Sequence, residues 1–270
     1  MVRFALFAPC LLAPCLITAC AAPQPDISAD LLAALDGRNA ATLDSLSIDD
    51  RACAFDAAGL GTLTALKRLS ITTCTDGFDY SGIRDLAQLE ELRIEDGTLS
   101  DTLFVFGLEN LHTLILDDTR VVQLAPLRSL TNLQTLSLRN TPLVRLEPLA
   151  DLAALGHLDV SDSYVLDLSP LAGVPSLRHL AVAQSRIGDL DGLEALPNLD
   201  TVELAGNGIA DLAPLLANPA LGEGVFVNLD GNCLADTPEV TDQLARLRAR
   251  GVTLSADNQN AECDRSYFGG

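Results

Sequence analysis

Leucines that recur with one fixed period, as from Leu111 to Leu133 to Leu155, are the feature of this sequence that most constrains its fold. The unit L-x-x-L-x-L, with Val at some of the leucine positions, occurs five times in one phase and begins at Leu111, Leu133, Leu155, Leu177 and Leu199. A unit of this length cannot bury its own apolar face and must stack on its neighbours, which is typical of a solenoid. Copies with slightly longer spacings extend the pattern from Leu43 to Leu254. We therefore expect about ten repeats in a single domain.

Each repeat is predicted to contain a short strand followed by a tight turn. The alternating L-x-L indicates a strand with one buried face. The second half has an apolar residue at every third position, which favours 3₁₀ turns, and a proline column suits the first turn of a helical segment: Pro126, Pro148, Pro170 and Pro214. Strands lie about 4.8 Å apart and turns are bulkier, so the stack should curve. This predicts an α/β solenoid with a concave parallel sheet, convex 3₁₀ or short helical turns, and capped ends.

These repeats resemble the leucine-rich repeat superfamily, specifically the 22-residue class with the pattern L-x-x-L-x-L-x-x-N-x-[IL]-x-x-L-x-x-L that occurs in bacterial internalin-like proteins. The resemblance implies a curved, right-handed solenoid. The asparagine column of the family contains Asn only at Asn207 and Asn232, and other residues elsewhere: Cys74, Thr119, Thr141, Ser163 and Ser185. Hydroxyls bond local backbone with fewer donors than an amide, so we expect a weaker polar ladder and an intact fold.

The first residues carry a targeting signal. Arg3 precedes an apolar stretch, and Leu16-Ile17-Thr18-Ala19-Cys20 resembles a bacterial lipobox, in which cleavage precedes a cysteine that becomes lipidated. We expect residues 1–19 to be a lipoprotein signal peptide, 20–30 a lipidated tether and 31–270 the repeat domain. Ala21 after the cysteine resembles lipoproteins sent to the outer membrane, so the expected location is the bacterial outer membrane through the lipid alone. The alternative is an ordinary signal cut near Ala22 that discards Cys20.

Export into an oxidising compartment changes how the remaining cysteines are interpreted. The repeat domain has four: Cys53, Cys74, Cys233 and Cys263. An even number favours disulfides. Their grouping suggests Cys53–Cys74 near one end of the solenoid and Cys233–Cys263 near the other, each contributing on the order of 2–4 kcal/mol. A zinc site made of all four is the alternative, and it is disfavoured because the pairs should lie far apart.

One segment has the signals of a longer helix. Thr237 is a suitable N-cap, Pro238 fits the first turn and Gly251 can end the helix. We expect residues 238–250 to form a capping helix for the last repeat. Arg246, Arg248 and Arg250 gather at its C-terminal end, where positive charge complements the helix dipole. A basic patch that binds an acidic group is the alternative.

Composition and motifs exclude several functions. A net charge of −20 and an isoelectric point near 4.2 argue against nucleic-acid binding, which depends on Lys and Arg. No H-E-x-x-H, Gly-rich phosphate loop or G-x-S-x-G occurs, so we predict no enzymatic activity and no cofactor. His157 and His179 occupy equivalent positions of successive repeats and should be neighbours about 5 Å apart on adjacent strands. Two ligands make a poor metal site, so no metal is predicted.

The concave face is the predicted binding surface. Its outward positions and the residues just beyond the strands form a mostly acidic stripe interrupted by arginines: Arg93, Glu95, Asp96, Asp117, Asp118, Arg139, His157, Asp159 and Asp162. A basic protein segment is the expected ligand, with a glycan as a second possibility, and the alternative is a solvated face. We expect a monomeric, lipid-anchored envelope binding module. The alternative function is a structural envelope protein without a discrete ligand.

Overall fold

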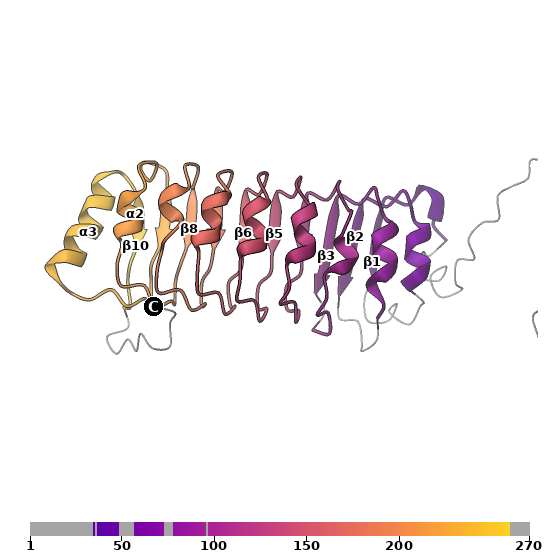
Figure 1. Cartoon of the computed structure of the whole chain (residues 1–270), viewed down its shortest axis with the longest axis horizontal. Helices are drawn as coiled ribbons and strands as arrows, with labels where there is room; N and C mark the ends of the chain where they lie inside the picture. The colour runs from indigo at the N-terminus through magenta and orange to yellow at the C-terminus, as the bar shows by residue number, and fades with distance from the viewer. Residues whose placement is uncertain (1–34, 36, 49–56, 73–77, 96, 260–270) are drawn as a thin grey trace, which may run out of the picture.

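Ten parallel strands follow one another in sequence order along the whole molecule (Figure 1). The computed structural model of the 270-residue chain describes residues 35, 37–48, 57–72, 78–95 and 97–259. The strands are β1 Ser45–Ile48, β2 Arg68–Thr72, β3 Glu91–Glu95, β4 Thr113–Ile115, β5 Thr135–Ser137, β6 His157–Asp159, β7 His179–Ala181, β8 Thr201–Glu203, β9 Phe226–Asn228 and β10 Thr253–Ser255. This arrangement confirms the predicted ten-repeat solenoid with its parallel sheet.

Short turns form the opposite, convex side of each repeat, in front of the strands in Figure 1. They are η1 Ala40–Thr42, η2 Ala57–Thr62, η3 Tyr80–Asp85, η4 Leu103–Val105, η5 Ala125–Ser129, η6 Glu147–Asp151, η7 Ser169–Gly173, η8 Leu193–Ala195 and the α-helical turn α2 Ala213–Ala217. The proline column opens four of these turns, as predicted. Proline fits there because the first turn of a helix leaves its N–H groups unpaired.

The core is a stack of leucines in register. Leu114, Leu136, Leu158 and Leu180 pair successively across β4 to β7, and each is fully buried. Successive side chains of a strand point to opposite faces of the sheet. Since the leucines point inward, the residues on either side of each leucine lie on the concave face. The strand register predicted from the L-x-L pattern is therefore correct in these repeats.

The last repeat differs from the prediction. The spacing read from the sequence placed Val252 beside Val227, but Leu254 occupies that position and Thr253 pairs with Phe226. The convex side of this repeat contains the twelve-residue helix α3, Pro238–Ala249, instead of a short turn. The longer helix needs two more residues before the chain returns to the sheet, so the register shifts by two. Because the shift is even, the buried face of β10 stays on the inside.

The helix α3 begins and ends close to the predicted bounds. The Thr237 hydroxyl accepts a hydrogen bond from the Val240 amide at 3.3 Å, and Gly251 has a φ of 91° at the C-terminal end. Arg250 donates to the carbonyls of Leu216 and Asn218 at 2.8 and 3.0 Å. Arg250 therefore caps the end of α2, and it holds the last helix against the preceding repeat. This favours the structural interpretation of that arginine over a binding patch.

The polar column beside the strands confirms the expected difference between amides and hydroxyls. Asn207 donates to the carbonyls of Val182 and Leu204 at 2.7 and 3.0 Å, and its oxygen accepts from the Ile187 amide at 3.1 Å. At the equivalent position, the Thr141 hydroxyl makes one bond, to the carbonyl three residues earlier, at 2.8 Å. An asparagine thus connects two repeats, whereas this threonine supports its own turn.

Several predicted features lie outside the described residues: Cys20, Cys53, Cys74, Asp96, Cys263 and the boundaries within residues 1–34. Cys233 is described; it is 6% exposed and takes part in a disulfide. Its pairing with Cys263, and that of Cys53 with Cys74, remain predictions. Among the described residues, no helix combines the length and the apolar character that crossing a bilayer requires.

Candidate functional site

Three residues after each of the strands β4 to β7, the chain has a residue in the left-handed backbone conformation. Asp118, Asn140, Asp162 and Gln184 have φ values between 51° and 57°. Aspartate and asparagine tolerate this conformation better than most residues, which explains their recurrence at one position of the repeat. The Asp118 and Asp162 amides donate to carbonyls of the next repeat at 2.9 and 2.8 Å. The turn thus continues the ladder and leaves the acidic side chains at the edge of the concave face.

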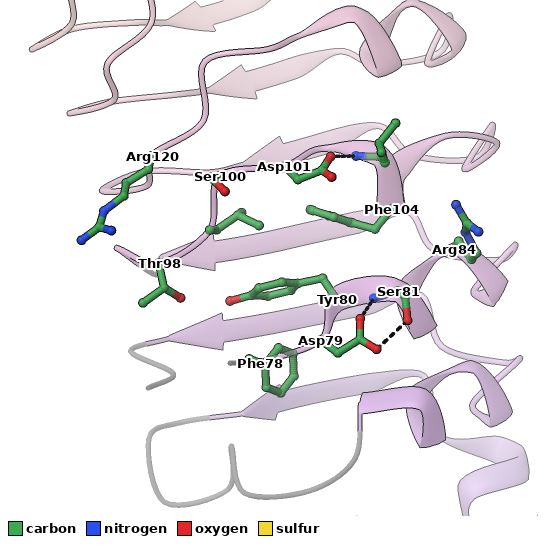
Figure 2. A pocket seen from close by; sticks show the side chains of 12 residues that line it. Phe78, Asp79, Tyr80, Ser81, Arg84, Thr98, Ser100, Asp101, Phe104 and Arg120 are labelled. Carbon is green, nitrogen blue, oxygen red and sulfur yellow. Dashed lines mark hydrogen bonds between the residues drawn. The ribbon is translucent and has the colours of Figure 1, made fainter. Parts of the chain in front are cut away.

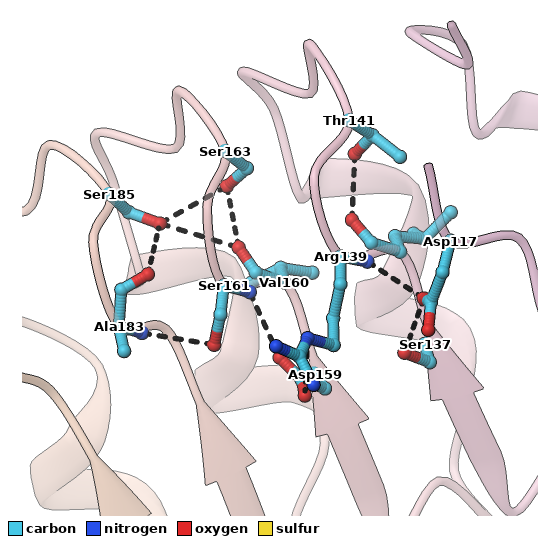
Figure 3. A network of polar contacts seen from close by, with 11 residues as sticks. Asp117, Ser137, Arg139, Thr141, Asp159, Val160, Ser161, Ser163, Ala183 and Ser185 are labelled. Carbon is cyan, nitrogen blue, oxygen red and sulfur yellow. Dashed lines mark hydrogen bonds and ion pairs between the residues drawn. The ribbon is translucent and has the colours of Figure 1, made fainter. Parts of the chain in front are cut away.

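Hydrogen bonds and an ion pair hold the charged side chains at or just beyond the ends of β4 to β6 against the sheet (Figure 3). The Asp117 carboxylate accepts hydrogen bonds from the Ser137 hydroxyl and the Arg139 amide at 2.6 and 2.9 Å. The Arg139 guanidinium forms an ion pair with Asp159 at 3.7 Å. Asp159 also accepts from the Ser161 amide at 3.0 Å, and its side chain is only 17% exposed. These two carboxylates face outward, as predicted, and they also fix the ends of the strands.

Five of the polar residues at this edge surround an open hollow of about 490 Å³, called here the acidic hollow: Asp117, Asp118, Arg139, Asn140 and Asp162. Inside it, the Asn140 amide donates to the Asp118 carboxylate at 2.7 Å. Three carboxylates and one guanidinium leave the acidic hollow negative overall, so it is suited to a cationic group. Asn140 occupies the same position of its repeat as Asp118 and Asp162 do in theirs, so the sequence already places it in the column beyond the strands.

The N-terminal part of the predicted stripe is separate from the acidic hollow. Arg93 and Glu95 form an ion pair with each other on β3. Ile115 lies next to Arg93 in the register and separates it from Ser137 on the following strand. The predicted stripe thus contains a neutral ion pair and the acidic hollow, and two further members, His157 and Asp159, lie beside the hollow and do not line it.

Comparisons with known proteins support this architecture. Internalin C2 from Listeria monocytogenes superposes with a TM-score of 0.60 at 23% identity, covering 87% of this chain and 93% of that one. A leucine-rich repeat protein from Leptospira interrogans gives a TM-score of 0.52 at 15% identity, covering 75% of this chain and 63% of that one. The fold is a leucine-rich repeat solenoid. No protein-family model and no curated protein matches the sequence.

Two histidines stack on the concave face of this leucine-rich repeat solenoid. The rings of His157 and His179 lie 4.2 Å apart between centroids and 3° from parallel. The nitrogen lone pairs of parallel rings point side by side and do not converge on one ion. Among the described residues, no group of three or more His, Cys, Asp or Glu is placed to hold a metal. The geometry thus gives no reason to assign a metal to this pair.

We expect the histidine pair to make stability depend on pH. Desolvation and the nearby His179 lower the pKa of His157 below 6.5, and Asp159 opposes this only in part. A histidine whose pKa is lowered by folding is neutral in both states above its unfolded-state pKa, and the folded state then has its full stability. As the pH falls below that value, protonation favours the unfolded state and stability is lost. We expect the thermal midpoint to fall between about pH 7.5 and pH 5.5, and less so in His157→Gln. Scanning calorimetry across this range checks it.

The matched control is His112→Gln, since His112 is exposed. This variant should keep the wild-type slope of midpoint against pH. An identical slope in His157→Gln would mean that the stacked pair does not carry the dependence.

Proposed function

We propose that this protein is a bacterial interaction module that binds a basic segment of another protein in the acidic hollow of its concave face. The observation that carries this proposal is the cluster of three carboxylates around one guanidinium at the end of β4 to β6. The left-handed backbone at Asp118 and Asp162 fixes the direction in which these side chains leave the chain, so the backbone of the site needs little ordering on binding. A cationic glycan is the second ligand class that this chemistry suits. The absence of catalytic motifs from the sequence is consistent with a binding role.

We further propose that the protein works as a lipid-anchored monomer in the bacterial envelope, at the outer membrane. The support is the lipobox-like sequence that ends at Cys20. Cys20→Ser should block processing or release the protein from the membrane fraction, because the thioether-linked lipid would have no attachment point. Fractionation and intact-mass analysis of the mature protein check this. Unchanged fractionation with unchanged mass would favour an ordinary signal peptide instead.

Neutralising the acidic hollow tests the binding proposal. Asp118→Asn with Asp162→Asn removes two carboxylates and retains residues that accept a positive φ. We expect capture of the partner from bacterial envelope extract to fall at least about tenfold relative to wild type. Capture by the wild-type protein should itself weaken as salt increases, since screening shortens the range of the charges.

The matched control is Asp167→Asn with Asp189→Asn, which removes two exposed carboxylates from the loops that follow the strands. Both residues accept a hydrogen bond from the backbone two residues later, and asparagine can still do so. Equal capture by both double variants would remove the acidic hollow as the site. The structural envelope protein without a discrete ligand would then be the better interpretation.

A further inference from the structure

The exposed large apolar side chains of the described residues all lie in four consecutive repeats. They are Leu103, Phe106, Val122, Val144, Tyr164 and Leu166, between 37% and 65% exposed. Each of them comes after the strand of its repeat, in the segment that leads to the convex turn or in and next to that turn. The repeats concerned are those of β3 to β6. Clustered apolar exposure of this kind marks interaction surfaces, and isolated residues do not. This region is called here the flank.

Backbone contacts place equivalent positions of the flank side by side. The Arg120 amide donates to the Leu99 carbonyl at 2.7 Å, and the Tyr164 amide donates to the Leu143 carbonyl at 2.9 Å. Each of these bonds joins one repeat to the one before it. Val122, Val144 and Leu166 occupy the same position of three successive repeats and so form a continuous apolar row. An extended chain that runs along the solenoid would contact all three.

The N-terminal end of the flank contains a hollow of about 590 Å³ with an aromatic floor (Figure 2). The rings of Tyr80 and Phe104 lie 5.6 Å apart between centroids, and Phe78 packs edge-on against Tyr80 at 4.8 Å. The exposed Leu103 forms part of the rim. The volume and lining suit one large apolar side chain, since ligand pockets of this size are mostly apolar with a few polar groups.

Two aspartates and two arginines line this aromatic hollow, and it is the arginines that favour an anionic group in the ligand. The Asp79 carboxylate accepts from the Ser81 amide at 2.8 Å, and Asp101 accepts from the Leu103 amide at 2.6 Å, so both acids are already bonded to the turns that follow them. Arg84 and Arg120 lie at opposite ends of the aromatic hollow, and within the described residues neither guanidinium forms an ion pair or a hydrogen bond. Arginine is the side chain best suited to recognise a carboxylate.

We propose that the flank binds an extended segment of a partner protein that combines apolar and acidic side chains. One large apolar side chain enters the aromatic hollow, carboxylates pair with Arg84 and Arg120, and further apolar side chains cover the row from Val122 to Leu166. This ligand is opposite in charge to the one proposed for the acidic hollow. The two surfaces are therefore separate sites, and the flank does not depend on the proposed function.

Selection from a displayed library of random peptides against the purified full chain tests this inference. We expect the enriched peptides to combine Asp or Glu with Leu, Phe or Trp. Their affinity should fall at least about tenfold in Leu103→Ser with Arg120→Glu, because the variant loses an apolar contact and reverses a charge. Both residues are exposed, so the fold should be unaffected, and circular dichroism checks this.

Two controls separate the flank from other surfaces. Arg248→Glu reverses one exposed charge on α3, far from the flank, and should leave peptide affinity unchanged. Asp118→Asn with Asp162→Asn should also leave it unchanged, because these residues belong to the acidic hollow. Enrichment of basic peptides, no enrichment, or equal binding by the flank variant would overturn the proposal. Loss of binding in the acidic-hollow variant alone would also overturn it.

Discussion

Leu158→Ala should lower the free energy of unfolding by about 2–5 kcal/mol. Leu158 is fully buried, and it pairs in register with Leu136 on one side and Leu180 on the other. The truncation leaves a cavity in the middle of the stack, where neither neighbouring repeat can collapse without disturbing its own register. Urea unfolding followed by circular dichroism measures the loss.

Ile115→Ala is the matched control for this prediction. Ile115 is also a four-carbon aliphatic side chain on a strand, but it points to the concave face and is partly exposed. Its truncation should cost less than about 1.5 kcal/mol because water already contacts the side chain. The opposite order of the two losses would mean that the strand faces are exchanged.

Asn207→Ala should produce a loss of similar size, about 2–5 kcal/mol, for a different reason. The substitution leaves the buried Val182 carbonyl and the buried Ile187 amide without their side-chain partner. The Leu204 carbonyl, in contrast, keeps its bond from Asn232. Asn207 itself is only 1% exposed. Each unpaired buried group costs about 1–3 kcal/mol, partly recovered when the repeat relaxes. Chemical denaturation again gives the measurement.

Ser185→Ala provides the comparison at the equivalent position one repeat earlier. The Ser185 hydroxyl makes only long hydrogen bonds, between 3.2 and 3.4 Å. Its removal should therefore cost about 1 kcal/mol or less. Similar losses in the two variants would show that the asparagine column contributes no more than the hydroxyls, and the ladder would then be unimportant for stability.

The fold could be predicted from the sequence because its signal is repeated. Where one copy departs from the pattern, as at Val160 and Val182, which occupy leucine positions, the spacing of the other copies still identifies the position. The prediction was wrong where the repeat is interrupted, at β10. There the register depends on how many residues the helix α3 uses before the chain returns to the sheet, and the repeat pattern does not give that number.

The candidate site was less accessible to sequence reasoning. Alternation showed that Asp117, Arg139 and Asp159 point outward. It could not show that Asp117 binds the Arg139 amide of the next repeat or that Asp159 binds the Ser161 amide two residues later, because such bonds depend on the path of the backbone after each strand. The flank was missed for a similar reason. Val122 and Val144 fit the apolar character of the repeat, and only their exposure distinguishes them from the core.

The strands β4 to β8 are evenly spaced along the solenoid, so its length is proportional to the number of repeats. Each of these strands pairs with the next at a constant offset of one repeat. Each repeat therefore contacts the following repeat through the same positions at every step. Duplicating or removing one whole unit in the gene therefore preserves the strand register and the column of buried leucines, and it changes the length of the protein by roughly one strand spacing of 4.8 Å. Evolution could adjust the distance between the two ends in steps of this size without redesigning the core.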